Sequence, residues 1–178
     1  DCLLSRGLGD VYKRQVVSCQ FSIHYYFKTP EMINIYLNNV SKSLKTGGRF
    51  IGTCLSGESV FEALKGKDTI SNEGSTLIWK ITKKYTQTKF SASDASLGME
   101  IGVYNESIGT TFNEFLTNMD YLTKTCSKYG LKLVENASFE NMFTSVGDAK
   151  KYGRVKEMDD NLKQYSFLNN YFVYEKTF

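Results

Sequence analysis

The sequence predicts an α/β fold, and three observations in the first third of the chain support it. Residues 16–23 form a short apolar run that is typical of a buried strand, residues 30–44 place apolar side chains at helical spacing, and residues 49–55 form a second apolar run. The connections between these elements are short, so the strand–helix–strand unit implies two parallel strands joined by a right-handed crossover. Ligands of such sheets lie beyond the carboxyl ends of the strands, so we expect a site after Ile23 and after Thr53.

The predicted helix begins at Pro30, because Thr29 is a favourable N-cap residue and proline suits the first helical turn. The apolar stripe that it would bury comprises Ile33, Tyr36, Leu37, Val40 and Leu44. Lys42 and Lys45 suit the negative C-terminal end of the helix dipole. The pair Gly47-Gly48 is expected to end the helix.

The rest of the chain predicts further elements by the same patterns. Apolar and polar side chains alternate in residues 77–82 and 99–104, which indicates two strands that we interpret as an inserted β element. The other predicted elements are a short helix around Val60, Phe61 and Leu64, a helix with the stripe Leu122, Cys126 and Tyr129 that Gly130 ends, a strand over 131–135 and a last strand over 171–176.

Composition and charge narrow the class of protein. At 178 residues, with 41% hydrophobic and 23% charged positions, the chain is expected to form one globular domain. It contains no run of about 18 apolar residues and no signal-peptide pattern, so we expect no membrane partner and an intracellular location. The net charge of +3 permits an anionic partner, but it falls short of the basic stripe of a protein that grips long nucleic acid.

No metal site is expected. The four cysteines, Cys2, Cys19, Cys54 and Cys126, are widely separated and His24 is the only histidine, so no cluster has the spacing of metal ligands. We interpret the cysteines as reduced thiols, because their spacing does not suggest a disulfide framework.

Residues 1–15 are expected to be a non-native segment, which leaves residues 16–178 as the domain itself. The segment has neither helical nor alternating periodicity, and it resembles a sequencing-library scar that recurs in translated environmental reads. Gly7 and Gly9 do not predict a phosphate-binding loop, because no predicted strand precedes them and no third glycine follows at the required spacing.

Side chains suited to chemistry are densest in residues 20–27, at the carboxyl end of the first predicted strand. On residue type alone a single histidine such as His24 is more often structural, and a run of aromatic residues more often packs in a core. The residues by themselves therefore leave a binding site and a packed core as open alternatives.

Separated motifs in this chain resemble those of the cap guanine-N7 methyltransferases of eukaryotes and large DNA viruses. The motifs are Val17 to Tyr25 with the helix and Gly47-Gly48 and residues 50–53 after it, Asn113-Glu114-Phe115-Leu116 with residues 128–134, and the closing residues 169–176. The resemblance implies the C-terminal portion of a Rossmann-like class I S-adenosylmethionine-dependent methyltransferase sheet. The N-terminal cofactor half of that family, with its glycine-rich loop, has no counterpart from Val16 onward, so we expect a truncated domain that is inactive alone.

The same resemblance implies two groups of site residues. The residues expected to lie against S-adenosylmethionine are Gln20, Ser22 and Tyr25. The cap guanine pocket would be lined by His24, Tyr25 and Glu114. Asn169 falls where the family has a cap-contacting tyrosine, and it can form hydrogen bonds but cannot stack on a base.

Glu114 has a chemical reason to recognise guanine. Guanine carries donors at ring N1 and at its exocyclic amine, so a carboxylate can accept both and distinguish guanine from adenine. The carboxylate would also offset the positive charge that the base gains on methylation. On residue type alone, the alternative is an exposed glutamate in a loop before a helix. No catalytic general base is expected, because the attacking lone pair is already present on the base, and His24 would position it.

The function implied by the resemblance is transfer of a methyl group from S-adenosylmethionine to N7 of the 5′ cap guanine of RNA. The expected partners are 5′-capped RNA and other capping-enzyme domains or subunits, in the nucleus of a cell or in a viral factory or virion. Two alternatives are kept: another class I methyltransferase that acts on a small molecule and does not need Glu114, and a non-catalytic subunit that binds capped RNA.

Overall fold

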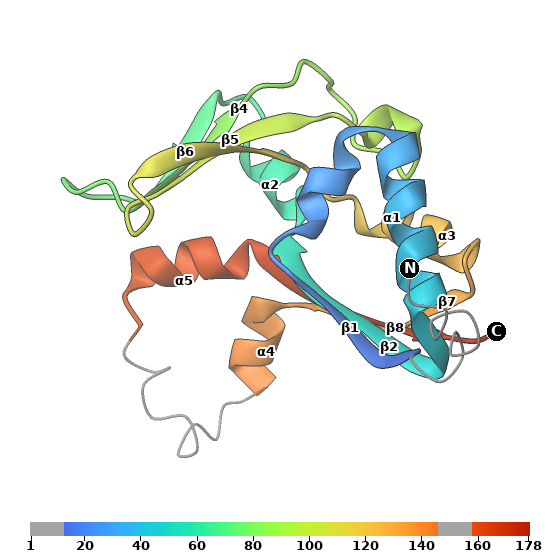
Figure 1. The fold of residues 1–178 in the computed structure, drawn as a ribbon. Coiled ribbons are helices and arrows are strands. Elements are labelled where there is room, and N and C mark those ends of the chain that lie inside the picture. Colours follow the sequence, from blue (N-terminus) through green and yellow to red (C-terminus); the bar gives the residue numbers. More distant parts are fainter. Residues whose placement is uncertain (1–12, 146–157) are drawn as a thin grey trace, which may run out of the picture.

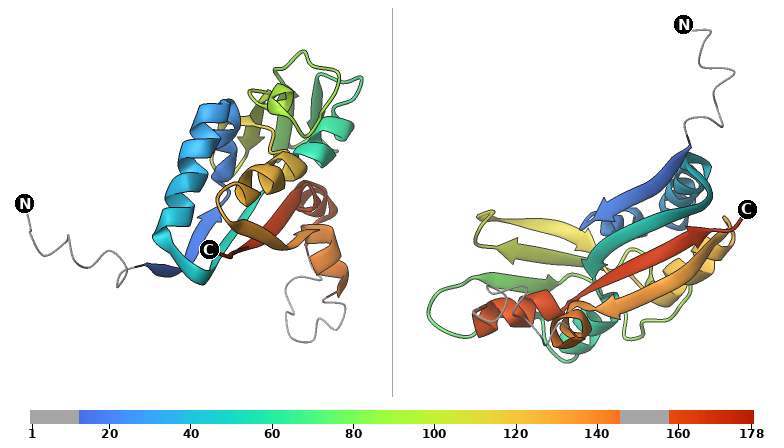
Figure 2. Two further views of the ribbon diagram at one scale, coloured as in Figure 1. Left: turned by 90° about the vertical axis from the view of Figure 1, so that its right-hand side faces the viewer. Right: turned by 90° about the horizontal axis from the view of Figure 1, so that it is seen from below.

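The structure, a computed structural model, describes residues 13–145 and 158–178, and these residues form two four-stranded sheets (Figure 1). The first sheet has the order β1-β2-β8-β7, and the second has the order β3-β4-β5-β6. The strands of the first sheet are β1 (Arg14–Gln20), β2 (Leu44–Leu55), β7 (Leu131–Ser138) and β8 (Asn169–Lys176). The strands of the second sheet are β3 (Thr69–Ser71), β4 (Trp79–Lys83), β5 (Glu100–Asn105) and β6 (Thr110–Phe115). Figure 2 shows the second sheet beyond the carboxyl end of β1.

The first sheet confirms the predicted α/β unit. Strand β1 pairs with β2 in parallel, and α1 (Pro30–Ser43) connects them. The Thr29 hydroxyl accepts a hydrogen bond from the backbone of Met32 at 3.2 Å, which is the expected N-cap. Strand β8 pairs antiparallel with both β2 and β7, a long-range pairing that local periodicity does not report.

The predicted end of α1 was wrong by one turn. Helix α1 ends at Ser43, and Leu44 is already the first residue of β2, fully buried and paired with Arg14. Its extended backbone, ψ 141°, excludes it from the helix. Gly47, at φ +77°, instead lies in the irregular start of β2, where the pairing with β1 shifts register.

The bounds of β1 also differ from the prediction. The strand begins at Arg14, inside the segment that we expected to be non-native, while residues 1–12 lie outside the described residues. It ends at Gln20 because Phe21 adopts a left-handed φ of +47° and Ile23 opens the 3-10 helix η2 (Ile23–Lys28). The turn at Phe21 directs η2 toward the second sheet.

The first core lies between the first sheet and the helices α1 and α3 (Met119–Ser127), which Figure 1 shows on one side of the sheet, with α4 (Phe139–Ser145) on the other. Phe50 and Phe172 are fully buried, with ring centroids 5.2 Å apart. Gly52 lies where a β-carbon would collide with the Phe172 ring and the Cys19 carbonyl. This close packing makes the sheet a rigid support for the residues at its carboxyl edge.

The second sheet is the predicted inserted β element, and it is larger than predicted. Strands β4 and β5 match the two predicted strands, and α2 (Gly57–Ala63) matches the short helix. The prediction missed β3, which is three residues long, and β6, whose first four residues are exposed and show no apolar alternation. The buried face of this sheet has its own apolar core around Trp79, Ile81 and Met99.

The C-terminal part holds two helices that the sequence did not predict, α4 (Phe139–Ser145) and α5 (Asp160–Phe167). Among the described residues, neither helix has a fully buried side chain, so neither has the apolar stripe on which a prediction depends. The predicted helix before Gly130 is α3, but Tyr129 lies beyond its end, and Gly130 itself has φ +70°. None of the helices within residues 13–145 and 158–178 has the length and apolar character needed to cross a membrane.

Candidate functional site

A pocket of about 490 Å³ opens where η2, the carboxyl end of β2, the β5–β6 hairpin, α5 and the start of β8 meet. Its lining residues are Phe21, His24, Tyr25, Leu55, Ile108, Phe112, Glu114, Tyr165 and Asn169. This is the carboxyl edge of the parallel strands, where we expected a ligand. The four residues predicted for the guanine pocket all line this one pocket, although the last lies 145 positions after the first.

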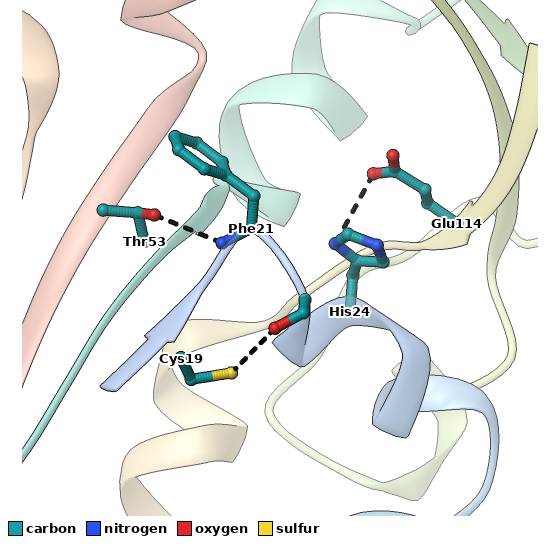
Figure 3. A network of polar contacts seen from close by, with 6 residues as sticks. Cys19, Phe21, His24, Thr53 and Glu114 are labelled. Atoms are coloured by element: carbon teal, nitrogen blue, oxygen red, sulfur yellow. Dashed lines mark hydrogen bonds and ion pairs between the residues drawn. The ribbon is translucent and has the colours of Figure 1, made fainter. Parts of the chain in front are cut away.

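His24 and Glu114 point toward each other at the pocket, one on η2 and the other on β6 (Figure 3). His24 Nδ1 lies 3.6 Å from Glu114 Oε2, and the two side chains are 6% and 16% exposed. Glu114 is therefore a largely buried strand residue, and the alternative of an exposed glutamate in a loop was wrong.

Burial sets the protonation of this pair. It lowers the pKa of His24 to about 4 and raises the pKa of Glu114 to about 7, because each charged form loses its hydration. Between pH 4 and pH 7 the imidazole is neutral and the carboxyl group retains its proton, so the two side chains do not form an ion pair in this range. Above pH 7 a carboxylate faces a neutral imidazole.

His24 also has an unpaired polar atom. Its Nε2 is buried without a hydrogen-bond partner among the described residues. The Tyr25 ring lies beside the imidazole, with centroids 4.2 Å apart at 60°, while Tyr25 itself is 46% exposed. A buried imidazole nitrogen without a partner is costly unless a ligand or a water molecule supplies one.

The wall opposite η2 comes from the β5–β6 hairpin. Phe112 and Glu114 are two positions apart on β6 and so point to the same face of the strand, toward the pocket. Ile108, in the turn before β6, extends this wall. Sequence reasoning missed Phe112, although the spacing of two between an aromatic residue and Glu114 was the signal that could have found it.

Asn169 and Tyr165 close the pocket at the C-terminal side. Asn169 is only 4% exposed, and its amide Nδ2 donates hydrogen bonds to the carbonyls of Tyr165 at 3.0 Å and Ser166 at 3.1 Å. Asn169 pairs with Leu55 across the first sheet, and both residues line the pocket. Sequence reasoning did not find Tyr165, because α5 shows no helical apolar pattern.

Two predicted cofactor residues, Gln20 and Ser22, do not line this pocket. Gln20 accepts a hydrogen bond from the Thr53 hydroxyl at 2.8 Å and donates one to the Ser18 hydroxyl at 2.9 Å. The Ser22 hydroxyl lies 3.3 Å from Cys19 Sγ. Both side chains are at the carboxyl end of β1, beside the turn at Phe21, whose backbone N–H donates to the Thr53 carbonyl at 2.9 Å. The third, Tyr25, is exposed and lines the pocket.

The polar groups at the end of β1 suit an S-adenosylmethionine site in their chemistry. Gln20 and Ser22 offer donors and acceptors at a strand end, and the turn at Phe21 brings them next to the pocket that Tyr25 lines. Within residues 13–145 and 158–178, no three side chains of the histidine, cysteine, aspartate or glutamate types gather as metal ligands would. Cys19, Cys54 and Cys126 are buried free thiols.

The architecture is that of the class I S-adenosylmethionine-dependent methyltransferases. A methyltransferase from Clostridium acetobutylicum that depends on S-adenosylmethionine superposes with a TM-score of 0.52 at 12% identity, over 93% of this chain and 59% of that one. The CcbJ methyltransferase from Streptomyces caelestis superposes with a TM-score of 0.51 at 14% identity, over 95% and 59% of the two chains.

Sequence comparison identifies the family. The profile of the mRNA (guanine-N(7))-methyltransferase domain matches residues 3–170, and the chain belongs to this family. This match begins upstream of Val16, where we had placed the start of the resemblance.

A probable mRNA-capping enzyme of Acanthamoeba polyphaga mimivirus is 31% identical over 173 residues, which are 90% of this chain and 14% of that protein. The mRNA cap guanine-N(7) methyltransferase of Candida albicans is 29% identical over 139 residues, 72% of this chain and 28% of that protein. The chain thus spans less than a third of the length of either relative.

Proposed function

We propose that this domain binds the 5′ cap of RNA and takes part in transfer of a methyl group from S-adenosylmethionine to N7 of the cap guanine. The observation that carries the proposal is the meeting of His24 and Glu114 in one largely buried pocket, 3.6 Å apart. Family membership supports the same substrate class, because the family takes its name from methylation of mRNA guanine at N7.

Glu114 is the residue that selects guanine. Its carboxylate accepts hydrogen bonds from guanine N1 and from the exocyclic amine, whereas adenine has no N–H at ring N1. Because the side chain is 16% exposed, a mismatched base leaves a nearly buried carboxylate unpaired. The same charge stabilises the methylated base, which is positive.

His24 positions the base and does not exchange protons during the reaction. With a pKa of about 4 the imidazole is neutral near pH 7, so one nitrogen donates and the other accepts. A ring N–H of His24 would donate to the guanine carbonyl next to N1 once the ring turns its buried Nε2, which has no partner among the described residues, toward the pocket. The guanine edge would then be held at both ends, by His24 and by Glu114.

The reaction needs orientation more than acid–base chemistry. The N7 lone pair is available without removal of a proton, so the pocket contributes by holding N7 in line with the methyl group that S-adenosylmethionine supplies when bound. Gln20, Ser22 and Tyr25 would hold that cofactor at the end of β1, next to the pocket. Such proximity effects reach about 7–11 kcal/mol in favourable cases.

Binding of dinucleotide caps tests the specificity. Isothermal titration of the chain with GpppG and ApppA is expected to give at least about fivefold tighter binding of GpppG, because an unpaired buried group costs about 1–3 kcal/mol. Glu114→Gln should lose most of this preference. The matched control is Glu106→Gln, an exposed glutamate on the same hairpin, which should keep it. Equal binding of both caps by the unaltered chain would contradict guanine recognition. It would favour a methyltransferase that acts on another small molecule.

Methyl transfer tests the activity. Because the sequence leads us to expect that the chain is inactive alone, it is fused behind the cofactor-binding segment of a family member. The fusion is incubated with S-adenosylmethionine carrying a tritiated methyl group and with RNA capped by guanosine, and the cap is then released by nuclease digestion to locate the label. Label at N7, reduced at least about tenfold by Glu114→Gln and unchanged by Glu106→Gln, is the expected result. Guanine-specific binding by the fusion without transfer, in the presence of saturating cofactor, would contradict the catalytic part of the proposal and favour a cap-binding subunit.

A further inference from the structure

Tyr165 lines the pocket and has no role in the proposed function. It lies on α5, and its side chain lines the pocket together with Tyr25 and Glu114. Phe21, Tyr25 and Phe112, the other aromatic residues of the lining, are 53%, 46% and 44% exposed, whereas Tyr165 is only partly exposed. Tyr165 is therefore the most enclosed of the four phenylalanine and tyrosine rings of the pocket wall.

Neighbouring contacts hold the Tyr165 ring in place. Its centroid lies 5.6 Å from that of Trp79, at an interplanar angle of 35°, and Trp79 is only 4% exposed. The Trp79 indole N–H donates to the carbonyl of Asn161 at 2.8 Å, which ties the start of α5 to the second sheet. The amide of Asn169 donates to the Tyr165 carbonyl at 3.0 Å, which fixes the end of α5. A ring held in this way loses little freedom when it takes up a ligand.

The same ring is close to the carboxyl group that we assign to guanine recognition. Burial, and to a smaller extent the charge of Glu114, raise the pKa of Tyr165 to about 12, so its hydroxyl is within electrostatic reach of that side chain. A purine whose edge binds Glu114 has faces that need apolar or aromatic cover. Asn169, the next pocket residue along the chain, is polar and is occupied with the backbone of α5.

We propose that Tyr165 is a specificity-determining residue that stacks on the purine ring and favours the methylated, positively charged purine over the unmethylated one. This inference rests on the proposed function. Aromatic faces carry negative potential, so a ring with a positive charge binds them more tightly than a neutral ring. Stacking on a fixed ring also holds the plane of the base while Glu114 and His24 hold its edge.

The test compares two variants at this position. Tyr165→Leu removes the aromatic face, and Tyr165→Phe keeps the face and removes the hydroxyl. Dissociation constants are measured by isothermal titration for a cap dinucleotide with and without the 7-methyl group. Tyr165→Leu should weaken binding of the methylated cap at least about fivefold, the lower end of the contribution of base stacking, and binding of the unmethylated cap by a smaller factor. Tyr165→Phe should stay within about twofold of the unaltered chain for both ligands.

If Tyr165→Leu and Tyr165→Phe both lose affinity, and each loses it equally for the methylated and the unmethylated cap, the role of Tyr165 is merely structural and the inference is overturned. Nuclear Overhauser contacts between the cap methyl protons and the Tyr165 ring, measured in the unaltered chain, do not depend on how well a variant folds, and their absence would also overturn it. If Tyr165→Leu binds both caps normally while Glu114→Gln loses guanine preference, this inference alone is wrong. If the unaltered chain binds neither cap, the proposed function is wrong as well.

Discussion

His24 and Glu114 should affect the pH dependence of the free energy of unfolding in opposite directions. The two effects cancel in the unaltered chain, so replacing either residue alone should reveal the effect of the other. The pKa of His24 falls from 6.5 in the unfolded chain to about 4 in the folded one. The unfolded chain therefore binds the extra proton between these values, and the folded chain loses stability as the pH falls from 6.5 to 4. A difference of about 2.5 in pKa corresponds to about 3 kcal/mol.

Glu114 acts in the opposite direction. Its pKa rises from 4.5 in the unfolded chain to about 7 in the folded one, so the folded chain holds a proton that the unfolded chain releases. The stability due to this group is present below pH 4.5 and is lost as the pH rises to 7, again by about 3 kcal/mol. Between pH 4.5 and 6.5 the two contributions cancel.

Urea unfolding at a series of pH values measures this effect, with the fluorescence of the single tryptophan, Trp79, as the probe. Relative to the unaltered chain, the free energy of unfolding of Glu114→Gln should fall by about 3 kcal/mol as the pH falls from 7 to 4, because only the His24 contribution remains. His24→Phe, which retains an aromatic ring beside Tyr25, should gain a similar amount over the same range, and the double variant should follow the unaltered chain. Single variants that both follow the unaltered chain would refute the burial of this pair.

The affinity for GpppG should rise as the pH increases through about 7, because the carboxylate of Glu114 is the form that accepts hydrogen bonds, and titration of Glu114→Gln should show no such rise. Gly52→Ala should destabilise the chain by about 1–3 kcal/mol in urea unfolding, since its β-carbon would collide with the Cys19 backbone and the Phe172 ring. Asn118→Ala should cost about 1 kcal/mol in the same assay, and Asn118→Asp much less, because the side chain accepts a hydrogen bond from the Tyr121 backbone at 2.8 Å at the start of α3.

The parallel strand–helix–strand unit was predictable because its signals are local. The cap at Thr29, the proline after it and the buried stripe of α1 lie within one short segment, and they give the helix its start and its inward face. The end of α1 was not predictable in the same way. The glycine pair looked like a helix stop, but pairing of Leu44 with Arg14 decided the boundary, and that contact joins residues thirty positions apart.

The site was predictable only in part, for a related reason. Apolar periodicity reports side chains that face a core, whereas β6 and α5 face an open pocket and carry mostly exposed or half-buried residues. Glu114 and Asn169 were found through resemblance to a family and not through pattern. Tyr165 had neither signal, since its place in the pocket depends on how α5 packs against Trp79.

A crystal structure of the chain with a 7-methylguanosine cap dinucleotide tests the central claim most directly. We expect guanine N1 and the exocyclic amine within about 3 Å of the Glu114 carboxylate oxygens, which is hydrogen-bond distance, with the opposite end of that edge at His24. A base bound elsewhere on the domain, or bound in this pocket with that edge turned away from Glu114, would contradict the account.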